Sequence, residues 1–248
     1  MNSNRKSVEC DYVVIGGGIV GGCIAYYLSR NNKEVICIDS GEFSGSNSNA
    51  GSIHVQLQSR NFRLNPHLID NLLENLPFYK EAVNAWDRLR LMLDVDFDLR
   101  VNGGLMVADN EEQMEFLYKK CQKEKAAGLD VEIMDSNKIK KIYPFLSNKV
   151  VGAEFCAHEG KLNPLVANKS LQEASIRSGV KIMKCETVSH IELRNNEYLI
   201  NTNLRDYICE KVIIAAGSGS GKLANFLNIN IPTIAEPLHM NVTEKVSM

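Results

Sequence analysis

The sequence lacks the cysteine spacing that disulfide frameworks and metal clusters require. Its seven cysteines are an odd number, are widely spread and include no C-x-x-C pair. Disulfide-rich secreted domains and zinc or ferredoxin-type sites show paired or closely spaced cysteines instead. We therefore expect no metal site and a protein of the reducing cytoplasm, with peripheral attachment to the inner face of a membrane as the alternative location.

An excess of charge of either sign is also missing. The 28 Lys and Arg residues nearly balance the 30 Asp and Glu residues, which leaves a formal net charge of −2. A nucleic-acid interface needs clustered Lys and Arg, so we expect no nucleic-acid partner. A hydrophobic fraction of 44% over 248 residues is that of an ordinary globular protein with a substantial core.

The uncharged stretch at residues 12–29 is just long enough to be tested as a membrane span. Five of its residues are glycine, three of them consecutive. Each glycine destabilises a helix by about 1 kcal/mol relative to alanine. We therefore interpret the glycines as a turn and expect no transmembrane span.

The first 40 residues combine features typical of a dinucleotide-binding βαβ unit. Residues 11–15 are a short β-branched run that predicts a buried strand, and the G-x-G-x-x-G motif Gly16–Gly21 follows directly. Apolar residues at helical spacing then run to Ser29, and residues 33–38 predict a second strand that Asp39 closes. This order favours a dinucleotide site over a plain βαβ unit with a glycine turn.

Each part of this unit has a physical role in binding a dinucleotide. Gly16 allows a sharp turn, Gly18 lets a diphosphate approach the backbone, and Gly21 lets the helix pack closely on the strand. The helix N-terminus offers unpaired N–H groups and about half a positive charge. Asp39 is suited to accept hydrogen bonds from ribose hydroxyls. The residues expected to contact the dinucleotide here are Gly16, Gly18, Ile19, Val20, Gly21, Asp39 and Ser40.

The opening segment, residues 11–39, resembles the FAD-dependent amino-acid oxidoreductases of the D-amino-acid oxidase, glycine oxidase and sarcosine oxidase type. Three later segments resemble that family in the same order. Residues 46–51 resemble the polar loop that wraps the flavin diphosphate, residues 159–164 the D-G-x-x-x-P motif before a long helix, and residues 212–217 the second strand that contacts the dinucleotide. The resemblance implies a Rossmann-like α/β domain of glutathione-reductase type, interleaved with a partial α+β substrate domain.

The resemblance also implies that the cofactor is FAD. A NAD-dependent dehydrogenase would continue with alternating strands and helices, whereas here successive strands are expected, at 181–183, 188–193, 198–202 and 207–214. By the same resemblance, the nucleotide also contacts the polar loop, the strand start that meets the adenine and the small residues that end the last strand. These residues are Ser46, Asn49, Ala50, Gly51, Ser52, Val188, Ala215, Ala216 and Gly217.

Two kinds of region alternate along the chain. We expect residues 1–62 and 150–228 to form a discontinuous FAD-binding domain, and residues 63–149 and 229–248 to form part of a substrate domain. The resembling family continues well beyond the length of this chain. Within the substrate region the sequence predicts a helical stretch broken near Pro77, a strand pair around two glycines, an amphipathic helix and a short strand, at 66–93, 96–108, 111–127 and 131–134.

The resemblance implies an oxidoreductase that transfers hydride from the amine Cα–H of an amino acid or N-substituted amino acid to the flavin. The catalytic candidate is His54, because the alternation of apolar and polar residues over Gly51–Gln58 predicts a strand with His54 and Gln56 on one face. A histidine there could hydrogen-bond or exchange a proton with the substrate. A purely structural histidine is the alternative.

The substrate and the partners stay open at this point. D-amino acids, glycine, sarcosine, opines and hydroxyproline-like compounds all fit the resemblance, and the electron acceptor is undetermined. Residues 49–60 resemble the subunits of opine or hydroxyproline dehydrogenases, which work with partner subunits. The alternatives to an amino-acid oxidase are a truncated, non-catalytic FAD-binding fragment, or a subunit completed by another chain, and, less favoured, a NAD-dependent dehydrogenase.

Overall fold

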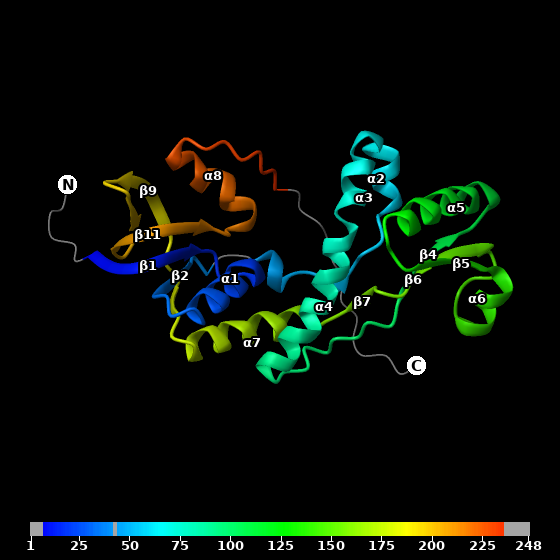
Figure 1. Cartoon of the computed structure of the whole chain (residues 1–248), viewed down its shortest axis with the longest axis horizontal. Helices are drawn as coiled ribbons and strands as arrows, with labels where there is room; N and C mark the ends of the chain where they lie inside the picture. The colour runs from blue at the N-terminus through cyan, green and yellow to red at the C-terminus, as the bar shows by residue number, and fades with distance from the viewer. Residues whose placement is uncertain (1–6, 42–43, 236–248) are drawn as a thin grey trace. The chain divides into compact units, whose positions relative to one another are not determined.

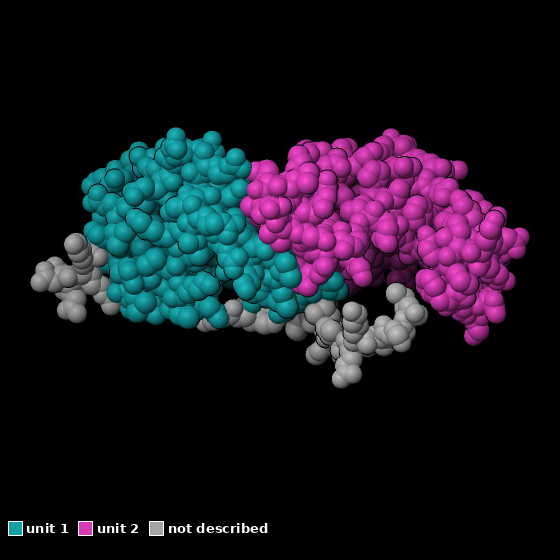
Figure 2. All heavy atoms as spheres, turned by 90° about the horizontal axis from the view of Figure 1, so that it is seen from below, with its two compact units in different colours: residues 1–50, 164–248 teal, residues 51–163 magenta. Residues whose placement is uncertain are grey.

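The computed structural model describes residues 7–41 and 44–235, and the chain folds into two compact units. Unit 1 contains residues 1–50 and 164–248, and unit 2 contains residues 51–163 (Figure 2).

The boundaries of these units differ from the domain boundaries that we expected near residues 62 and 150. The chain leaves unit 1 after Ala50 and leaves unit 2 after Asn163. The assignment of a separate substrate domain stays a prediction, and the end of its second segment, residues 236–248, lies outside the described residues.

Unit 1 is built on a six-stranded sheet. Its strands are β1 (Ser7–Ile15), β2 (Val35–Asp39), β8 (Lys181–Lys184), β9 (Val188–Arg194), β10 (Glu197–Thr202) and β11 (Asp206–Ile214). They lie in the order β8-β2-β1-β11-β10-β9, and Figure 1 labels β2, β1, β11 and β9 of this sheet. The first four strands of this order run parallel, and β10 and β9 add an antiparallel extension beside β11. This sheet confirms the predicted α/β fold class.

Two of the helices of unit 1 pack closely against each other. The helices are α1 (Ile19–Ser29), α7 (Pro164–Arg177) and α8 (Ser220–Ala224), with 3₁₀ turns at Gly45–Asn47, Gly217–Gly219 and Asn225–Leu227. A Cβ on Gly22 of α1 would lie only 3.1 Å from the Leu171 side chain of α7. The predicted order of strand, helix and strand in residues 11–39 is confirmed.

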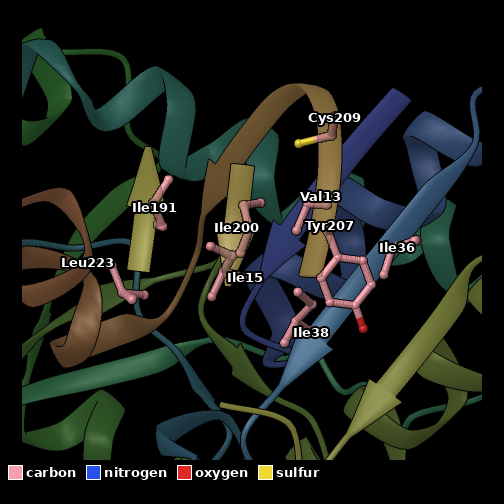
Figure 3. Packing of buried hydrophobic residues seen from close by; sticks show 9 residues of the cluster. All are labelled: Val13, Ile15, Ile36, Ile38, Ile191, Ile200, Tyr207, Cys209 and Leu223. Carbon is pink, nitrogen blue, oxygen red and sulfur yellow. The ribbon is translucent and has the colours of Figure 1, made fainter. Parts of the chain in front are cut away.

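Branched apolar side chains explain the burial of the parallel strands. Val13 of β1 and Ile36 and Ile38 of β2 are at most 1% exposed. Tyr207 of β11 is fully buried, and its ring lies beside Ile36 and Ile38 (Figure 3). The Tyr207 hydroxyl donates a hydrogen bond to the buried Glu186 carboxylate at 2.8 Å, which satisfies the polar end of the ring.

Unit 2 contains a three-stranded antiparallel sheet and a two-stranded ribbon. The sheet strands are β4 (Gly104–Ala108), β5 (Val131–Asp135) and β6 (Gly152–Cys156), in the order β4-β6-β5. The ribbon pairs β3 (Ser52–Ile53) with β7 (Gly160–Lys161). The helices are α2 (Ser59–Leu64), α3 (Ile69–Glu74), α4 (Leu76–Leu93), α5 (Glu111–Ala126) and α6 (Ser136–Ile142), with a 3₁₀ turn at Pro66–Leu68. No helix in the described ranges combines the length and apolar character needed to cross a bilayer.

Two strand predictions for unit 2 are wrong. The strand expected over residues 51–58 is limited to β3. The strand pair expected over residues 96–108 is the single strand β4, because Phe97 and Asp98 adopt left-handed backbone conformations with φ of 22° and 52°. The sequence predicted no element at the position of the central strand β6. We had assigned this part of the chain, from residue 150 onward, to the FAD-binding domain.

A buried ion cluster joins α5 to β6 in unit 2. The Lys120 ammonium lies 2.7 Å from Glu154 Oε2 and 2.9 Å from Glu124 Oε2, and all three side chains are 0% exposed. Loss of hydration disfavours the charged carboxylate and raises the pKa of Glu154 to about 7, although Lys120 acts in the opposite direction. Glu154 therefore holds a proton at pH values where an exposed glutamate is ionised.

We expect Glu154→Gln to weaken the pH dependence of stability. Because the folded pKa of about 7 lies above the ordinary value of 4.5, the stabilisation from Glu154 is fully present below 4.5 and is lost as pH rises through about 7. In urea titrations at about pH 5 and about pH 8, the free energy of unfolding falls with pH in the wild type and falls less in Glu154→Gln. Glu132→Gln, whose side chain is 50% exposed, is the control that follows the wild type. An equal fall in all three proteins would contradict the assignment.

Candidate functional site

The carboxyl ends of β1, β2 and β11 meet at Gly16. The Gly16 N–H donates to the Ile38 carbonyl at 2.8 Å. Its φ of 112° lies in a region that residues with a side chain rarely adopt, and a Cβ here would collide with the Ala215 carbonyl oxygen. The turn therefore requires glycine at this position.

The lack of a Cβ has different consequences at Gly21 and at Gly18. Gly21 lies against the backbone of the turn, because a Cβ on it would collide with the Gly16 carbonyl oxygen. A Cβ on Gly18 would lie 2.8 Å from the Ser46 hydroxyl oxygen, which belongs to a side chain that is able to rotate. Packing of the fold therefore requires Gly21, whereas Gly18 keeps the surface of the turn free of a side chain.

The first turn of α1 faces the loop that contains Ser46. The Ser46 hydroxyl oxygen accepts a hydrogen bond from the Ile19 N–H at 2.9 Å. Val20, the next residue of the helix, is 60% exposed. Asn49 closes the loop by donating from its amide to the Ser46 carbonyl at 3.0 Å. A helix N-terminus beside a small hydroxyl is suited to an anionic diphosphate.

Asp39 ends β2 directly beside the glycine turn. Its Oδ1 accepts a hydrogen bond from the Gly41 N–H at 2.7 Å, and a Cβ on Gly17 would collide with its Oδ2. Gly17 packs against this acid and is a residue that we did not single out, although the run of three glycines contained that signal. The Asp39 carbonyl also accepts from the Glu186 N–H at 3.0 Å, so the segment that leads into Val188 starts beside this acid.

Small residues after β11 complete this end of the sheet. The Ala215 N–H donates to the Ile15 carbonyl at 2.8 Å, and Gly217 has a positive φ of 56° where the next 3₁₀ turn begins. The structure thus gathers most of the predicted nucleotide-binding residues of unit 1 at the carboxyl ends of parallel strands. They are Gly16, Gly18, Ile19, Val20, Gly21, Asp39, Ser40, Ser46, Ala215, Ala216 and Gly217, with Asn49 and Ala50 at the end of the Ser46 loop and Val188 at the start of β9.

A polar stripe on α7 supports the glycine turn, and sequence reasoning missed it. The Gln172 side-chain amide donates to the Gly17 carbonyl at 2.8 Å, and the Asn168 amide donates to Asn47 Oδ1 at 2.8 Å. Ser175, one turn further along the same face, is buried. The spacing of residues 168, 172 and 175 was a signal for this stripe, because such positions lie on one face of a helix.

The remaining predicted residues belong to unit 2. Gly51 has a positive φ of 68°, and Ser52 pairs with Lys161 in the two-stranded ribbon. The prediction that His54 and Gln56 share one face of a strand is wrong, since the strand ends at Ile53. The His54 side chain is 57% exposed, whereas Gln56 is 4% exposed. Contact of Gly51, Ser52 and His54 with a cofactor in unit 1 stays a prediction.

The groups that unit 1 gathers fit a dinucleotide. The glycine turn has no Cβ where a diphosphate would approach, the Ile19 N–H at the helix start meets the Ser46 hydroxyl beside that turn, and Asp39 provides a carboxylate for hydroxyl groups. Among the residues that the structure describes, no group of three or more His, Cys, Asp or Glu side chains is arranged to bind a metal ion.

Comparison with known proteins points in the same direction as this geometry. A family model described as FAD dependent oxidoreductase matches residues 11–246. Glycine oxidase of Bacillus subtilis is 26% identical over 88% of this chain, and an opine oxidase subunit of Agrobacterium tumefaciens is 23% identical over 96% of it. The chain spans 57% and 64% of the length of these two proteins.

A solved structure shares the fold. L-α-glycerophosphate oxidase from Mycoplasma pneumoniae, with FAD bound, matches 88% of this chain and 57% of its own chain with a TM-score of 0.72 and 24% identity. This likeness supports the predicted FAD-binding fold.

We expect Gly21→Ala to destabilise the fold even without any ligand. The new methyl group collides with the Gly16 carbonyl oxygen, and overpacking of this kind lowers the free energy of unfolding by about 2 kcal/mol. Urea titration measures the change. Gly45→Ala is the matched control, because its Cβ has nothing within 4 Å, and its stability stays within about 0.5 kcal/mol of the wild type. Equal stability of Gly21→Ala and Gly45→Ala would show that the turn is not closely packed.

Proposed function

Because the chain belongs to the family of FAD-dependent oxidoreductases, we propose that unit 1 holds FAD and that the whole protein oxidises the amine Cα–H of an amino acid or N-substituted amino acid. One observation carries this proposal. At the glycine turn, the Ile19 N–H, the Ser46 hydroxyl and the Asp39 carboxylate surround a backbone without side chains. Such a set suits the diphosphate and ribose of a dinucleotide.

Each nucleotide-binding residue has a role in this proposal. Gly18 and Ile19 face the diphosphate, and the Ser46 hydroxyl turns from its helix contact to a diphosphate oxygen. The Asp39 carboxylate accepts hydrogen bonds from the ribose hydroxyls. Val188, in the strand that starts beside Asp39, presents its backbone to the adenine.

When bound, FAD supplies the acceptor for the hydride that leaves the substrate carbon. Loss of hydride from Cα requires the neutral amine, so a group that accepts a proton from the substrate ammonium assists the reaction. His54 is our candidate for that group, because its imidazole is more than half exposed and is able to reach a ligand.

Opines and related N-substituted amino acids are the substrates that we favour. The likeness to a protein named as part of an opine oxidase supports this choice, and residues 49–60 carry the segment that we matched to such proteins. The same likeness supports a partner subunit that completes the substrate site.

Oxidation of a glycerol phosphate is the second candidate function. It is supported by the fold shared with a protein named as an L-α-glycerophosphate oxidase. A NAD-dependent dehydrogenase, in contrast, loses support from the match to a FAD-dependent family.

We expect the purified chain to bind FAD and Gly18→Ala to bind it about tenfold more weakly or worse. The added methyl group occupies the space where the diphosphate approaches, and tenfold weaker binding corresponds to a loss of about 1.4 kcal/mol. Fluorescence titration gives the dissociation constant, and co-elution on gel filtration checks it. Gly45→Ala is again the control and binds like the wild type. A wild-type chain that binds NAD but not FAD would contradict the proposal.

Anaerobic bleaching of the bound flavin identifies the substrate class. We expect amino acids or opines to bleach the flavin absorbance and glycerol 3-phosphate to leave it unchanged. His54→Ala slows bleaching by about a hundredfold at neutral pH, because general base catalysis contributes about that much. Bleaching by glycerol 3-phosphate alone would favour the second candidate instead.

A further inference from the structure

The three consecutive backbone N–H groups of residues 55–57 donate hydrogen bonds to buried carboxylates. The Val55 and Gln56 N–H groups both donate to Glu159 Oε1, at 3.0 and 3.1 Å. The Leu57 N–H donates to Glu124 Oε1 at 2.7 Å. This part of the chain lies outside any helix or strand, so these side chains replace the hydrogen bonds that regular structure would supply.

The Glu159 carboxylate is confined on several sides. Glu159 is only 6% exposed. A Cβ on Gly104 would collide with its Oε2, and the Glu159 carbonyl accepts from the Gly103 N–H at 2.9 Å. A buried carboxylate is stable only when it is hydrogen-bonded or paired, so the amides of residues 55 and 56 and this carboxylate depend on each other.

The same carboxylate also faces the imidazole of His54. Glu159 Oε2 lies 3.5 Å from His54 Nδ1. A carboxylate beside one ring nitrogen favours the tautomer in which that nitrogen carries the proton, and the other nitrogen is then an acceptor. With Nδ1 facing Glu159, Nε2 is the nitrogen left for a ligand.

We propose that Glu159 is a positioning residue that holds the turn at Val55 and Gln56 and keeps neutral His54 protonated on Nδ1. His54 thereby presents a basic Nε2. The use of that nitrogen to accept a proton from a substrate ammonium rests on the proposed function. The positioning itself does not, because every contact that carries it lies within unit 2 and involves no cofactor.

The first test measures amide hydrogen exchange in the chain without added cofactor. In Glu159→Ala, exchange at Val55 and Gln56 becomes about tenfold faster or more, because their acceptor is gone. Leu57 is the internal reference, since Glu124 still holds its N–H group, and its exchange stays within about threefold. Uniform acceleration at all three amides, or no acceleration at Val55 and Gln56, would overturn the proposal.

The second test uses Glu159→Gln, which keeps an oxygen acceptor for the two amides and so guards against loss of folding. Nitrogen-15 NMR correlation of the imidazole at about pH 8, where histidine is mostly neutral, reports which nitrogen is protonated. We expect the Nδ1–H tautomer of His54 in the wild type and a shift toward the Nε2–H tautomer in Glu159→Gln. Glu132→Gln is the control, because it removes an exposed carboxylate of the same unit, and we expect it to leave the tautomer unchanged. An Nε2–H tautomer in the wild type would overturn the proposal.

These readouts separate the two proposals. If the wild type fails to bind FAD but shows the Glu159-dependent exchange and tautomer, the proposed function fails and the positioning role stands. If FAD binds and substrate bleaches it at the same rate in wild type and Glu159→Gln, with an unchanged tautomer, the positioning role fails and the proposed function stands.

Discussion

The structure of unit 1 depends on the close approach of backbone segments at the glycine turn. Gly16 lies against the carbonyl of Ala215, Gly21 lies against the carbonyl of Gly16, and Gly17 lies against the carboxylate of Asp39. No side chain fits at the two contacts with backbone carbonyls, so packing holds the strand ends and the helix start in place. A ligand that binds here meets a backbone whose turn is already fixed, which lowers the ordering cost of binding.

Unit 2 holds its irregular segment by a different physical means. Two buried carboxylates, Glu124 and Glu159, accept hydrogen bonds from the backbone N–H groups of residues 55–57. The Lys120 ammonium balances part of the buried negative charge. Charges that are hydrogen-bonded in this way tolerate few alternative conformations, because removing one partner leaves the other buried and unsatisfied. Lys120 also contacts Glu154, whose burial raises its pKa to about 7, so the same ion cluster reaches from α5 to the sheet strand β6.

Sequence reasoning succeeded where the determining interactions are local. The strand, glycine turn, helix and second strand of residues 11–39 form within one short segment, and their order was predictable from spacing alone. The contact of Gln172 with Gly17 spans 155 residues, and that of Glu159 with Val55 spans 104. Nothing in the spacing of either segment specifies such a partner. The alternating residues after Gly51 show the same limit, since they predicted a strand where carboxylates from distant segments bind the backbone of residues 55–57.

The chain passes between the two units within two segments that the sequence analysis had matched to a cofactor-binding family. The loop at 46–51 and the motif at 159–164 were matched to a cofactor-binding family, yet each also contains the residue pair where the chain passes from one unit to the other. In unit 2 these connections are hydrogen-bonded, because the Leu162 N–H donates to the Gly51 carbonyl at 2.8 Å. The motif begins with Glu159, which anchors the His54 turn, and ends at Pro164, where α7 begins and leads to Gln172 at the glycine turn. A motif of this kind need not touch a substrate to matter for function, since it sets the backbone from which both candidate sites are built.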